Sequence, residues 1–492
     1  MYLSKSQYCS AVQCPKMLWL KKNKPDMFDN SCMNQAVLDT GNEVGKLAQE
    51  LFGEFVEVPF TKDFDEMLDT TAMLMSNNTP VLAEASFSFE GLFCRVDILR
   101  NLGDRKVELY EVKSSTSVKD IYKDDIFYQR YILTQLGYQV TKACIVHINN
   151  QYVRHGKLDL SQLFVLCDLT DDAEESHDEV QNFIAWLKQY MSQESAPTDD
   201  IDEKCFTPYE CGFFAYCTRS LPTPNVFNLS GVRKPKKFKC YREGLISYND
   251  LYHAGVFPIN TSVQIEHELF SLPPKIEKKP ILDFMKRLSY PLYFLDFESF
   301  NPAIPLYDNS RPYEQIVFQY SLHIMEQEEG RLQHKEFLAY PGKDPRRELA
   351  ERLCKDIPLN ACTLAYNMTF EKTRIKELAN LFPDLSGHLM NIVDHMQDLM
   401  IPFQKKYYYI REMEGSYSIK YVLPALFPND PALDYHNLEG VHNGEEASET
   451  FKRMAEMSDK ELAVYRGHLL KYCGLDTFAM VKIWEKLKEV VC

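Results

Sequence analysis

Two stretches of the chain, before about residue 220 and after about residue 289, each alternate apolar strand-like segments with helical segments. This order restricts the fold more than any other feature of the sequence. In the first stretch, helices precede strands near residues 80–100 and 107–113, a helix over "DIFYQRYILTQLGY" and a strand at "KACIVHIN". An α–β–β–β–α–β order predicts a mixed sheet flanked by helices, so we expect an α/β fold.

The chain is long enough for more than one domain, because 492 residues can form two or three separate cores. A second α/β pattern starts at "YPLYFLDFESF" and runs to the C-terminus. The residues between the two patterns are richer in Pro and Lys and read as a connector with short helices. We therefore expect a first domain over residues 1–220, a connector over 221–288 and a second domain over 289–492.

The overall composition is that of a soluble globular protein, with 45% hydrophobic and 26% charged residues. No apolar run approaches the length of a membrane span, and the first residues, "MYLSKSQYCS", lack the apolar core of a signal peptide. These features favour the cytoplasm and exclude a membrane partner. In a reducing compartment, the fourteen cysteines are expected to be buried thiols or metal ligands, and not disulfides.

The net charge of −16 argues against phosphate binding over the whole surface. Nucleic acid remains a candidate partner, because its binding depends on local basic grooves. The segment "RKPKKFKCYR" (residues 233–242) offers one such group of charges with aromatic residues between them. A solvated linker accounts for this segment equally well.

The first candidate site lies in "ELYEVKSSTSVKD", where Glu111 and Lys113 project from the same face of a predicted strand. Such a pair alone is often a solvated one. However, Asp97 lies on the preceding strand, "FEGLFCRVDILR", and a hairpin closed at "NLGDR" brings Asp97 close to Glu111. Two carboxylates, water and a phosphate match the ligands of Mg²⁺ or Mn²⁺. Lys113 would then polarise the attacking water or stabilise the developing charge.

These residues resemble the core of the PD-(D/E)XK nucleases in their RecB-like branch. The resemblance rests on Asp97, Glu111-Val-Lys113 and the next helix with Gln129 and Tyr131. Its nearest forms are the CRISPR-associated RecB-like exonucleases and the AddB-type nuclease domain. The resemblance covers roughly residues 1–220 and implies a restriction-endonuclease-like fold.

One position departs from this family. Many RecB-like nucleases carry a histidine on an early helix as an additional metal ligand, and the segment "DTGNEVGKLAQELF" has Gly45 in that place. Glu43 and Glu50 are the acids that would replace it, and we take Glu43 as the candidate. The alternative is that both acids simply lie on the helix surface.

The resemblance also implies an iron–sulfur cluster, because the nearest family members carry one. The segment "CFTPYECGFFAYC" places Cys205, Cys211 and Cys217 at two equal C-x₅-C spacings, and "AVQCPKMLWL" supplies Cys14 upstream. A [4Fe–4S] cluster on these thiols would join the two ends of the domain and couple cluster binding to folding. A structural zinc ion and unliganded thiols are the alternatives, although zinc sites usually show C-x₂₋₄-C spacing. Cys9 competes with Cys14 as the upstream ligand.

The second candidate site begins with Asp296 and Glu298, two acids on one face of the apolar strand "YPLYFLDFESF". In a core these carboxylates repel each other, and a bound metal removes the conflict. Downstream, "LAYNMTFEKTRIKELA" offers Asn367 and Glu371. The helical "YCGLDTFAMVKIWEKL" carries the last pair, Tyr472 and Asp476, one turn apart.

The order of these residues resembles the DEDD exonucleases of the ribonuclease H-like fold. The resemblance implies that Asp296, Glu298, Glu371 and Asp476 hold two metal ions, and that Tyr472 orients the attacking water. Glu371 departs from the family, which usually has Asp there. The alternative is an ordinary helix pair at Tyr472 and Asp476, with Glu371 as a helix-start acid favoured by the dipole.

A further resemblance concerns the stretch "GSYSIKYVLPALFP" (residues 415–428) together with "LDFESF" and "YCGLDT". These segments resemble an uncharacterised bacterial domain family that is often joined to RecB-like nucleases. Membership of that family names no substrate.

Together these patterns predict a metal-dependent nuclease with a PD-(D/E)XK domain followed by a ribonuclease H-like domain. We expect Mg²⁺ or Mn²⁺ and an iron–sulfur cluster as cofactors, and nucleic acid, DNA rather than RNA, as the partner. The alternative is a nucleic-acid-binding adaptor of a defence or repair complex with one or both nuclease folds inactive. The intact acids favour activity, whereas Gly45 and Glu371 favour the adaptor.

Overall fold

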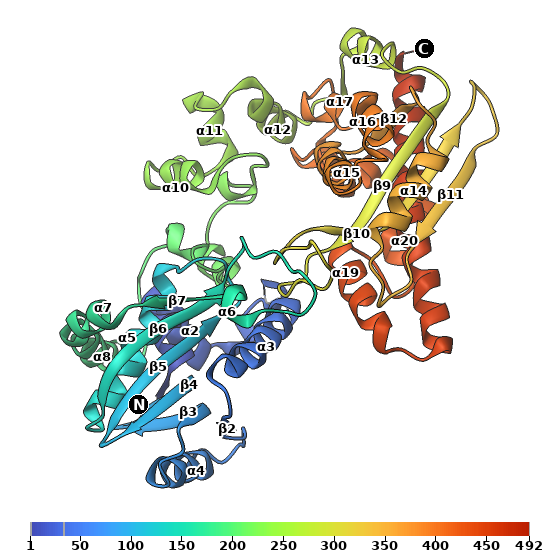
Figure 1. Ribbon diagram of the computed structural model, residues 1–492. Coiled ribbons are helices and arrows are strands. Elements are labelled where there is room, and N and C mark those ends of the chain that lie inside the picture. The colour runs from blue at the N-terminus through green and yellow to red at the C-terminus, as the bar shows by residue number, and fades with distance from the viewer. Residues whose placement is uncertain (1, 33–34, 492) are drawn as a thin grey trace. The chain divides into compact units, whose positions relative to one another are not determined.

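The computed structural model describes residues 2–32 and 35–491, and these residues divide into two units (Figure 1). The first unit comprises Met1–Ser220 and Pro302–Glu314, and the second comprises Leu221–Asn301 and Gln315–Cys492. Each unit combines helices with β-sheet, which confirms the predicted α/β class. None of the helices in the described part of the chain is long and apolar enough to cross a membrane.

The first unit is built on a seven-stranded sheet with the order β2-β3-β4-β5-β6-β7, and β1 pairs with β4. The pairs β3·β4, β4·β5 and β6·β7 are antiparallel, whereas β5·β6 is parallel. The strands are β1 (Leu3–Ser4), β2 (Val56–Glu57), β3 (Val81–Phe89), β4 (Leu92–Gly103), β5 (Lys106–Lys113), β6 (Gln139–Ile148) and β7 (Phe164–Asp168).

The first two helices of the first unit begin at residues that favour a helix start. Ser4 and Gln7 form a capping box at the start of the first helix, and Pro15 occupies the first turn of the second. The helices are α1 (Lys5–Gln13), α2 (Pro15–Asn23), α3 (Gln35–Gln49), α4 (Phe64–Ser76), α5 (Asp120–Gln135), α6 (Leu160–Leu163), α7 (Thr170–Glu175), α8 (His177–Tyr190) and α9 (Phe214–Thr218).

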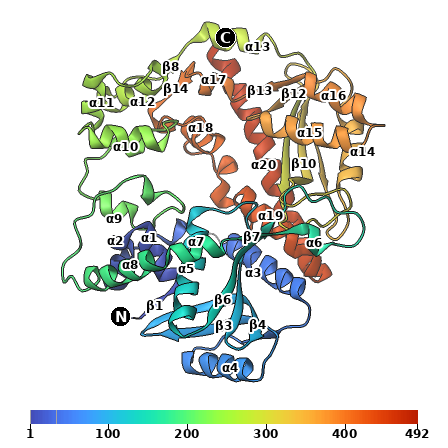
Figure 2. The same cartoon turned by 60° about the vertical axis from the view of Figure 1, so that its left-hand side comes forward.

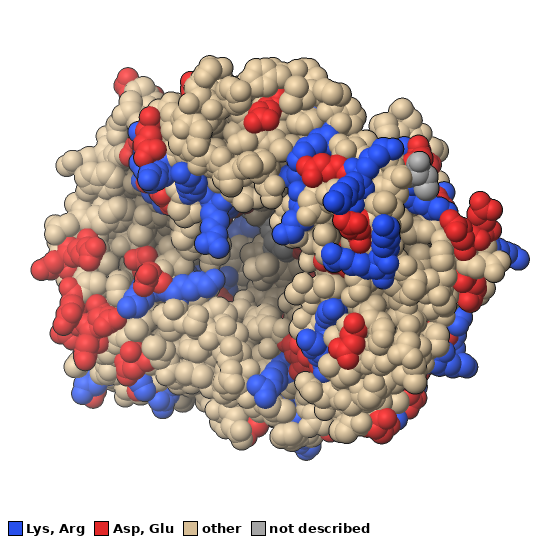
Figure 3. Space-filling view, turned by 90° about the horizontal axis from the view of Figure 1, so that it is seen from above, with Lys and Arg blue, Asp and Glu red and all other residues tan. Residues whose placement is uncertain are grey.

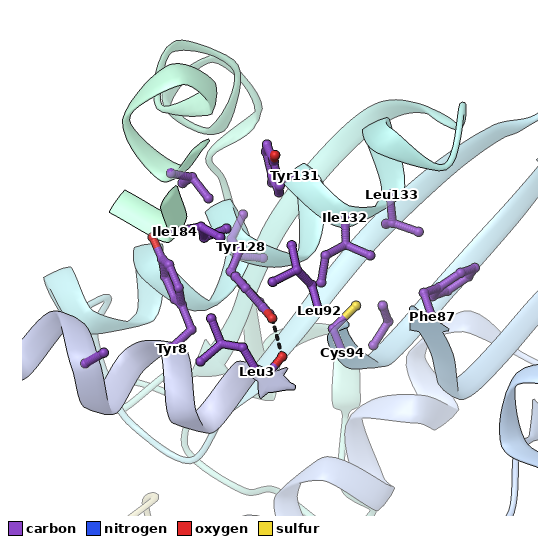
Figure 4. Close-up of a cluster of buried hydrophobic side chains, with 14 of the residues drawn as sticks. Leu3, Tyr8, Phe87, Leu92, Cys94, Tyr128, Tyr131, Ile132, Leu133 and Ile184 are labelled. Carbon is purple, nitrogen blue, oxygen red and sulfur yellow. Dashed lines mark hydrogen bonds between the residues drawn. The ribbon is translucent and has the colours of Figure 1, made fainter. Parts of the chain in front are cut away.

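The core of the first unit forms where α5 covers the sheet and meets α1 and α8. Figure 4 shows Tyr128 of α5 beside Tyr8 of α1, with the Tyr128 hydroxyl donating a hydrogen bond to the Leu3 carbonyl. Tyr128 and Ile132 are fully buried, and burial of a side chain such as Ile132 stabilises the fold by about 1.5–3 kcal/mol. This core holds the start of α1 against β4.

The second unit is built on a five-stranded sheet with the order β11-β10-β9-β12-β13. The pairs β9·β10 and β10·β11 are antiparallel, whereas β12 is parallel to both β9 and β13. The strands are β9 (Leu292–Phe300), β10 (Ile316–Met325), β11 (Gln333–Leu338), β12 (Cys362–Ala365) and β13 (Met396–Asp398).

Alternate residues of β9 face two different helical layers. Tyr293, Leu295 and Phe297 belong to the core with α14 (Arg346–Asp356), α15 (Thr369–Leu381) and α16 (Ser386–Asp394). Leu292 and Phe294 instead pack in the core that contains α20 (Asp459–Val491), which runs along the sheet in Figure 2. Because side chains alternate with period two, Asp296 and Glu298 lie on the α20 face.

The remaining helices of the second unit precede the sheet or follow it. Residues 221–288, expected as a connector, lie in this unit and contain α10 (Lys234–Arg242), α11 (Tyr248–Ala254), α12 (Ile259–Phe270) and α13 (Lys278–Met285). The first three of these share a small apolar core. After β13 come α17 (Ile401–Gln404), α18 (Ile419–Leu426) and α19 (Gly444–Arg453), and the short strands β8 (Lys275–Ile276) and β14 (Tyr408–Tyr409) pair with each other.

Candidate functional site

The hairpin of β4 and β5 brings Asp97 next to the Glu111–Lys113 segment in the first unit. The Asp97 carboxylate accepts a hydrogen bond of 2.7 Å from the backbone N–H of Val112. Lys113 Nζ lies 2.7 Å from one oxygen of Glu111. The side chain of Glu111 is only 2% exposed, so its charge lies inside the protein.

Helix α5 contributes the predicted Gln129, whose amide donates a 2.8 Å hydrogen bond to Glu111. Tyr131 faces elsewhere, because residues two apart on a helix point in different directions. It lies in the hydrophobic cluster of Figure 4. Its ring also contacts the ring of His177. Of these two α5 residues, Gln129 therefore contacts the candidate site, whereas Tyr131 packs in the core.

Two residues that the motifs did not indicate complete this charge cluster. Lys5, the first residue of α1, places its Nζ 2.8 Å from both oxygens of Glu111 and 3.8 Å from Asp97. Asp125 of α5 forms an ion pair with Lys113 and accepts a 3.0 Å hydrogen bond from the Cys9 thiol. Lys5 is 106 residues from Glu111 along the chain, so the local spacing of residues could not indicate that the two side chains meet.

The two carboxylates of this site differ in pKa. Burial raises the pKa of Asp97, and neighbouring Glu111 raises it further, to about 7. Burial acts in the same direction on Glu111, but Lys113 and Lys5 outweigh it and lower the pKa to about 2. Glu111 is therefore firmly ionised at neutral pH, whereas Asp97 titrates there.

A cavity of about 950 Å³ opens onto this cluster and is lined partly by α3. Gly45 lines the cavity, and a side chain there would meet nothing within 4 Å. Glu43 and Glu50 are exposed, and the residues of α3 that line the cavity are others: Val37, Leu38, Gly41, Asn42, Gly45, Lys46 and Gln49. Glu84, which the sequence reasoning missed, also lines the cavity and lies 3.2 Å from Arg95.

The four cysteines predicted as cluster ligands lie within electrostatic reach of one another. Burial raises the pKa of each thiol, and Cys14 raises the pKa of Cys205, Cys211 and Cys217 further. Cys9 points instead to Asp125. The structure thus places Cys14, and not Cys9, with the three later cysteines.

The spacing of these thiols differs from that of a zinc site. With Zn–S bonds of about 2.3 Å, tetrahedral sulfur ligands lie roughly 3.8 Å apart. Among the described residues, the only group of three or more His, Cys, Asp or Glu ligand atoms within 4.8 Å of one another is that of Asp296, Glu298 and Cys473. In the part of the chain that the structure describes, no three of these thiols all lie within 4.8 Å of one another, as three ligands of a tetrahedral zinc site would.

That compact group forms the second candidate site, where β9 faces α20. Glu298 is 6% exposed, and the Cys473 thiol lies 3.9 Å from an oxygen of Asp296. Burial raises the pKa of Asp296 well above its usual range, and Asp476, Glu298 and Glu371 raise it further. The structure therefore brings all four predicted acids together.

The predicted Tyr472 and Asn367 take different positions. Tyr472 is buried, and its hydroxyl forms a hydrogen bond that favours the ionised form of Asp476. Asn367 is exposed in the turn before α15, with φ of 69°, a conformation that asparagine tolerates. Its backbone N–H donates to the Asp398 carboxylate at 3.0 Å. Asn367 thus forms the backbone turn that precedes Glu371.

Few cationic side chains lie near the acids of this second cluster. Burial raises the pKa of Glu371 to about 8, with a contribution from Asp398. Burial also raises that of Asp476, to about 6, against hydrogen bonds from tyrosines and the charge of Lys420. Among the described residues, no Lys or Arg lies within ion-pair distance of the four acids, and one buried oxygen of Glu371 has no hydrogen-bond partner.

Four residues of this site escaped the sequence reasoning. Asp398 is the last residue of β13. The carboxyl ends of β13 and of the parallel strand β12 lie at the same edge of the sheet. Tyr435 donates a 2.6 Å hydrogen bond to Asp476. Cys473 and Lys420 stand inside the quoted segments "YCGLDT" and "GSYSIKYVLPALFP", so those segments were the available signal.

Comparisons with known proteins identify relatives without a described activity. Residues 293–418, which include Asp296, Glu298 and Glu371, match the family described as "Domain of unknown function (DUF2779)". Uncharacterized protein UU173 of Ureaplasma parvum is 29% identical over 238 residues, which cover 44% of this chain and 34% of that protein. Uncharacterized protein MG366 of Mycoplasma genitalium is 27% identical over 214 residues, covering 40% and 32%.

The chain thus spans about a third of the length of the curated relatives it matches. No solved structure gives a significant match. The predicted resemblance to an uncharacterised domain family agrees with the match to DUF2779, whose description names no activity.

Proposed function

We propose that this protein is a metal-dependent nuclease with a DEDD-type site in the second unit and a RecB-like site in the first. The observation that carries the proposal is the cluster of Asp296, Glu298, Glu371 and Asp476. These acids come from three separate segments of the chain, and burial raises the pKa of each. A fold gains nothing from gathering such repelling groups unless a cation joins them.

The acid cluster fits Mg²⁺ or Mn²⁺ better than a softer metal. Its carboxylates are hard oxygen ligands. One buried oxygen of Glu371 has no hydrogen-bond partner, so it is available to bind a metal ion. A divalent ion bound there lowers the pKa of a water and neutralises phosphate charge. Tyr472, beside Asp476, would hold the attacking water in line. The order of the five strands around central β9 supports a ribonuclease H-like fold.

The first unit supplies the second hydrolytic site of the proposal. Asp97 and Glu111 would hold the ion, Lys113 would stabilise the developing charge and Gln129 would orient Glu111. Lys5 now contacts both oxygens of Glu111, so a metal ion must share or replace that contact. The β4–β5 hairpin followed by α5 supports the restriction-endonuclease-like assignment.

An iron–sulfur cluster is the cofactor that best fits the four cysteine thiols of the first unit. Three of these thiols have two equal C-x₅-C spacings, and Cys14 lies within electrostatic reach of each of the three. Anaerobically purified protein should contain about four irons per chain. Cys14→Ser should lower the iron content, whereas the matched Cys9→Ser should not. Colourless protein with stoichiometric zinc would contradict the assignment.

Nucleic acid, DNA rather than RNA, is the proposed partner. Figure 3 shows basic side chains interspersed with acidic ones on one face, so phosphate binding must rely on local groups. Helix α10 offers such a group: its apolar Phe238 and Cys240 are buried, whereas Arg233, Lys234 and Lys239 are exposed. The sequence had left open whether this segment is a linker, and it forms a helix.

An oligonucleotide cleavage assay tests the proposal. Full-length protein should degrade labelled DNA with Mn²⁺ or Mg²⁺ and not with EDTA. Asp296→Ala should abolish cleavage at the second-unit site, and Asp97→Ala should abolish cleavage at the first-unit site. The double variant should cleave no DNA, whereas the exposed Asp394→Ala should cleave as wild type does. Full cleavage by the double variant would refute the proposal. Binding of DNA without cleavage under any metal would favour the adaptor alternative.

A further inference from the structure

One thiol lies among the carboxylates of the second candidate site. Cys473 of α20 is fully buried, and its Sγ lies 3.9 Å from a carboxylate oxygen of Asp296 and 3.8 Å from the backbone carbonyl oxygen of the same residue. Single ligand atoms of Asp296, Glu298 and Cys473 all lie within 4.8 Å of one another. The group therefore combines two hard oxygen ligands with one soft sulfur ligand.

These three side chains match the ligand set of a zinc ion. Zinc binds thiolate sulfur at about 2.3 Å and carboxylate oxygen at about 2.0–2.2 Å, usually in a tetrahedron. The ligand atoms of such a site are roughly 3.4–3.6 Å apart, so the 3.9 Å between Cys473 Sγ and the Asp296 oxygen requires only a small shift. Three protein ligands leave the fourth zinc position to water.

Buried contacts hold α20 against the sheet next to Cys473. The hydroxyl of Thr477, one helical turn after Cys473, lies 2.6 Å from the hydroxyl of Ser321 on β10. Ser321 is in turn paired with Asp296 across the sheet. The packing of α20 on β10 therefore places the thiol beside the Asp296 carboxylate, and ligands held on a strand and a helix are positioned more accurately than ligands on loops.

A fourth group beside these ligands has an unused oxygen atom. Glu371 is 3% exposed, and one of its carboxylate oxygens has no hydrogen-bond partner among the described residues. The charge of Glu371 raises the pKa of both Asp296 and Glu298, so it lies within electrostatic reach of both. A buried oxygen without a partner destabilises the fold unless a cation binds there. This oxygen indicates a cation independently of the thiol.

The thiol determines which divalent ion binds most tightly. Mg²⁺ and Mn²⁺ prefer oxygen ligands, whereas Zn²⁺ also accepts sulfur and generally binds mixed ligand sets more tightly than Mn²⁺ does. When zinc binds, the S–H bond of Cys473 breaks, the sulfur bonds to the zinc and the proton passes to solvent. Because Asp296 and Glu298 serve both kinds of ion, zinc excludes the Mg²⁺ or Mn²⁺ that these acids would hold.

We propose that Asp296, Glu298 and Cys473 form a zinc site whose occupation inhibits the hydrolytic site of the second unit. The inhibition rests on the proposed function, because it requires that Mg²⁺ or Mn²⁺ act at the same acids. The binding of zinc does not depend on any cleavage. Cys473 distinguishes the two states, since it is a ligand of zinc alone.

Calorimetric titration of the full-length protein with Zn²⁺ tests this inference. In Cys473→Ser the affinity of one zinc site per chain should fall at least about tenfold, because even the loss of a group that only supports a metal ligand costs about 10–100-fold. Mn²⁺ affinity should stay within about threefold of wild type, since the oxygen ligands that Mn²⁺ prefers are unchanged. Zinc held by the cysteines of the first unit is common to all the proteins compared.

Cys362→Ser is the matched control. Cys362 is also a buried cysteine of the second unit, but it lies opposite Leu292 at the start of β9, away from Asp296. This variant should bind both ions as wild type does. Retained Mn²⁺ affinity shows that Cys473→Ser has folded, and Cys473→Ala tests the same ligand if the serine variant does not fold.

Inhibition of cleavage by zinc is the functional measurement. It uses Asp97→Ala protein, in which only the second unit should cleave. Added Zn²⁺ should inhibit Mn²⁺-dependent trimming of an oligonucleotide, and half-inhibition should require at least about tenfold more zinc when Cys473→Ser is introduced.

Equal zinc affinity in wild type and Cys473→Ser would overturn the inference, and so would an equal loss in Cys362→Ser. An equal fall in Mn²⁺ affinity in Cys473→Ser would also overturn it, because the thiol would then only support the fold. If Mn²⁺-dependent cleavage occurs and zinc binding ignores Cys473, only this inference fails. If zinc binds through Cys473 and no oligonucleotide is cleaved with any metal, the zinc site stands and the nuclease proposal fails.

Discussion

The carboxylate clusters of the two units differ in how their charge is balanced. In the first unit, Glu111 is held between Lys5 and Lys113, at 2.8 Å and 2.7 Å, and its pKa falls to about 2. In the second unit, Asp296 and Glu298 face further acids, and their pKa values rise well above the usual range. The first cluster thus contains its own cations, whereas in the second the charge of Lys420 does not offset burial and the neighbouring acids.

Two similar acidic motifs can therefore have opposite effects on the stability of the folded protein. When one partner of a buried ion pair is removed, the fold loses stability, because a buried charge is left uncompensated. A set of repelling carboxylates instead lowers stability until metal binds, which is a common trade-off at functional sites.

The largest expected effect is a change of opposite sign when one acid of each cluster is neutralised. Glu111→Gln should lower the free energy of unfolding by about 2–3 kcal/mol, below the roughly 3–5 kcal/mol for a fully buried pair. The value is smaller because the Lys5 and Lys113 side chains remain 20% and 19% exposed. Asp296→Asn should raise the unfolding free energy in EDTA. Urea unfolding measures both, and a shift of the same sign would contradict the comparison.

Addition of Mn²⁺ should sharpen the same contrast. At a metal concentration ten times Kd, one site stabilises the folded protein by about 1.4 kcal/mol. We expect this stabilisation, measured as a thermal shift of the second unit, to vanish in Asp296→Ala. The exposed Asp394→Ala serves as the control and should keep the full shift. A shift that survives Asp296→Ala would place the metal elsewhere.

Tyr472→Phe should separate metal binding from chemistry at the second site. The change removes one hydroxyl beside Asp476 and none of the proposed ligands. Calorimetry should show Mn²⁺ affinity within about twofold of wild type, while kcat for trimming of 3′ ends falls about a hundredfold, the low end for a residue that assists proton transfer. An unchanged kcat would remove Tyr472 from the mechanism.

A further effect, spread over several pH units, is the pH dependence of the free energy of unfolding in EDTA. The folded protein retains the proton of Glu371 up to about pH 8, against an ordinary value of 4.5. The stabilising contribution of the protonated group is therefore full below pH 4.5 and is lost as the pH rises to 8. One proton accounts for at most about 1.4 kcal/mol per pH unit. Glu371→Gln should flatten this slope between pH 4.5 and 8.

Glu111 should show the reverse dependence. Its pKa of about 2 lies below the ordinary 4.5, so its contribution is present above pH 4.5 and is lost as the pH falls toward 2. The difference in unfolding free energy between wild type and Glu111→Gln should therefore shrink in acid. A difference that grows in acid would contradict the ion pairs with Lys5 and Lys113.

Local spacing in the sequence was enough to place the first residues of each site. The period of two along a strand put Glu111 and Lys113, and likewise Asp296 and Glu298, on one face. A short turn brought Asp97 back to Glu111, and a helical turn joined Tyr472 to Asp476. These relations are local because backbone geometry repeats within a few residues.

Other parts of both sites followed from tertiary structure alone. Lys5 reaches Glu111 because β1 pairs with β4, and Tyr435 reaches Asp476 from a separate segment. The excursion Pro302–Glu314 between β9 and β10 joins the first unit although its neighbours belong to the second. The alternation of strands and helices did not indicate any of these three relations.

The sequence by itself determined the α/β class, the two acidic motifs and the cysteine spacing, because each depends on periodicity or on neighbouring residues. Only the tertiary structure decided that Glu111 is paired with lysines while Asp296 is not, and that Cys14 joins the later cysteines while Cys9 contacts Asp125. The physical reason is that pKa and charge balance depend on burial and on groups within a few ångströms. Packing of distant segments places those groups, and their order along the chain does not reveal it.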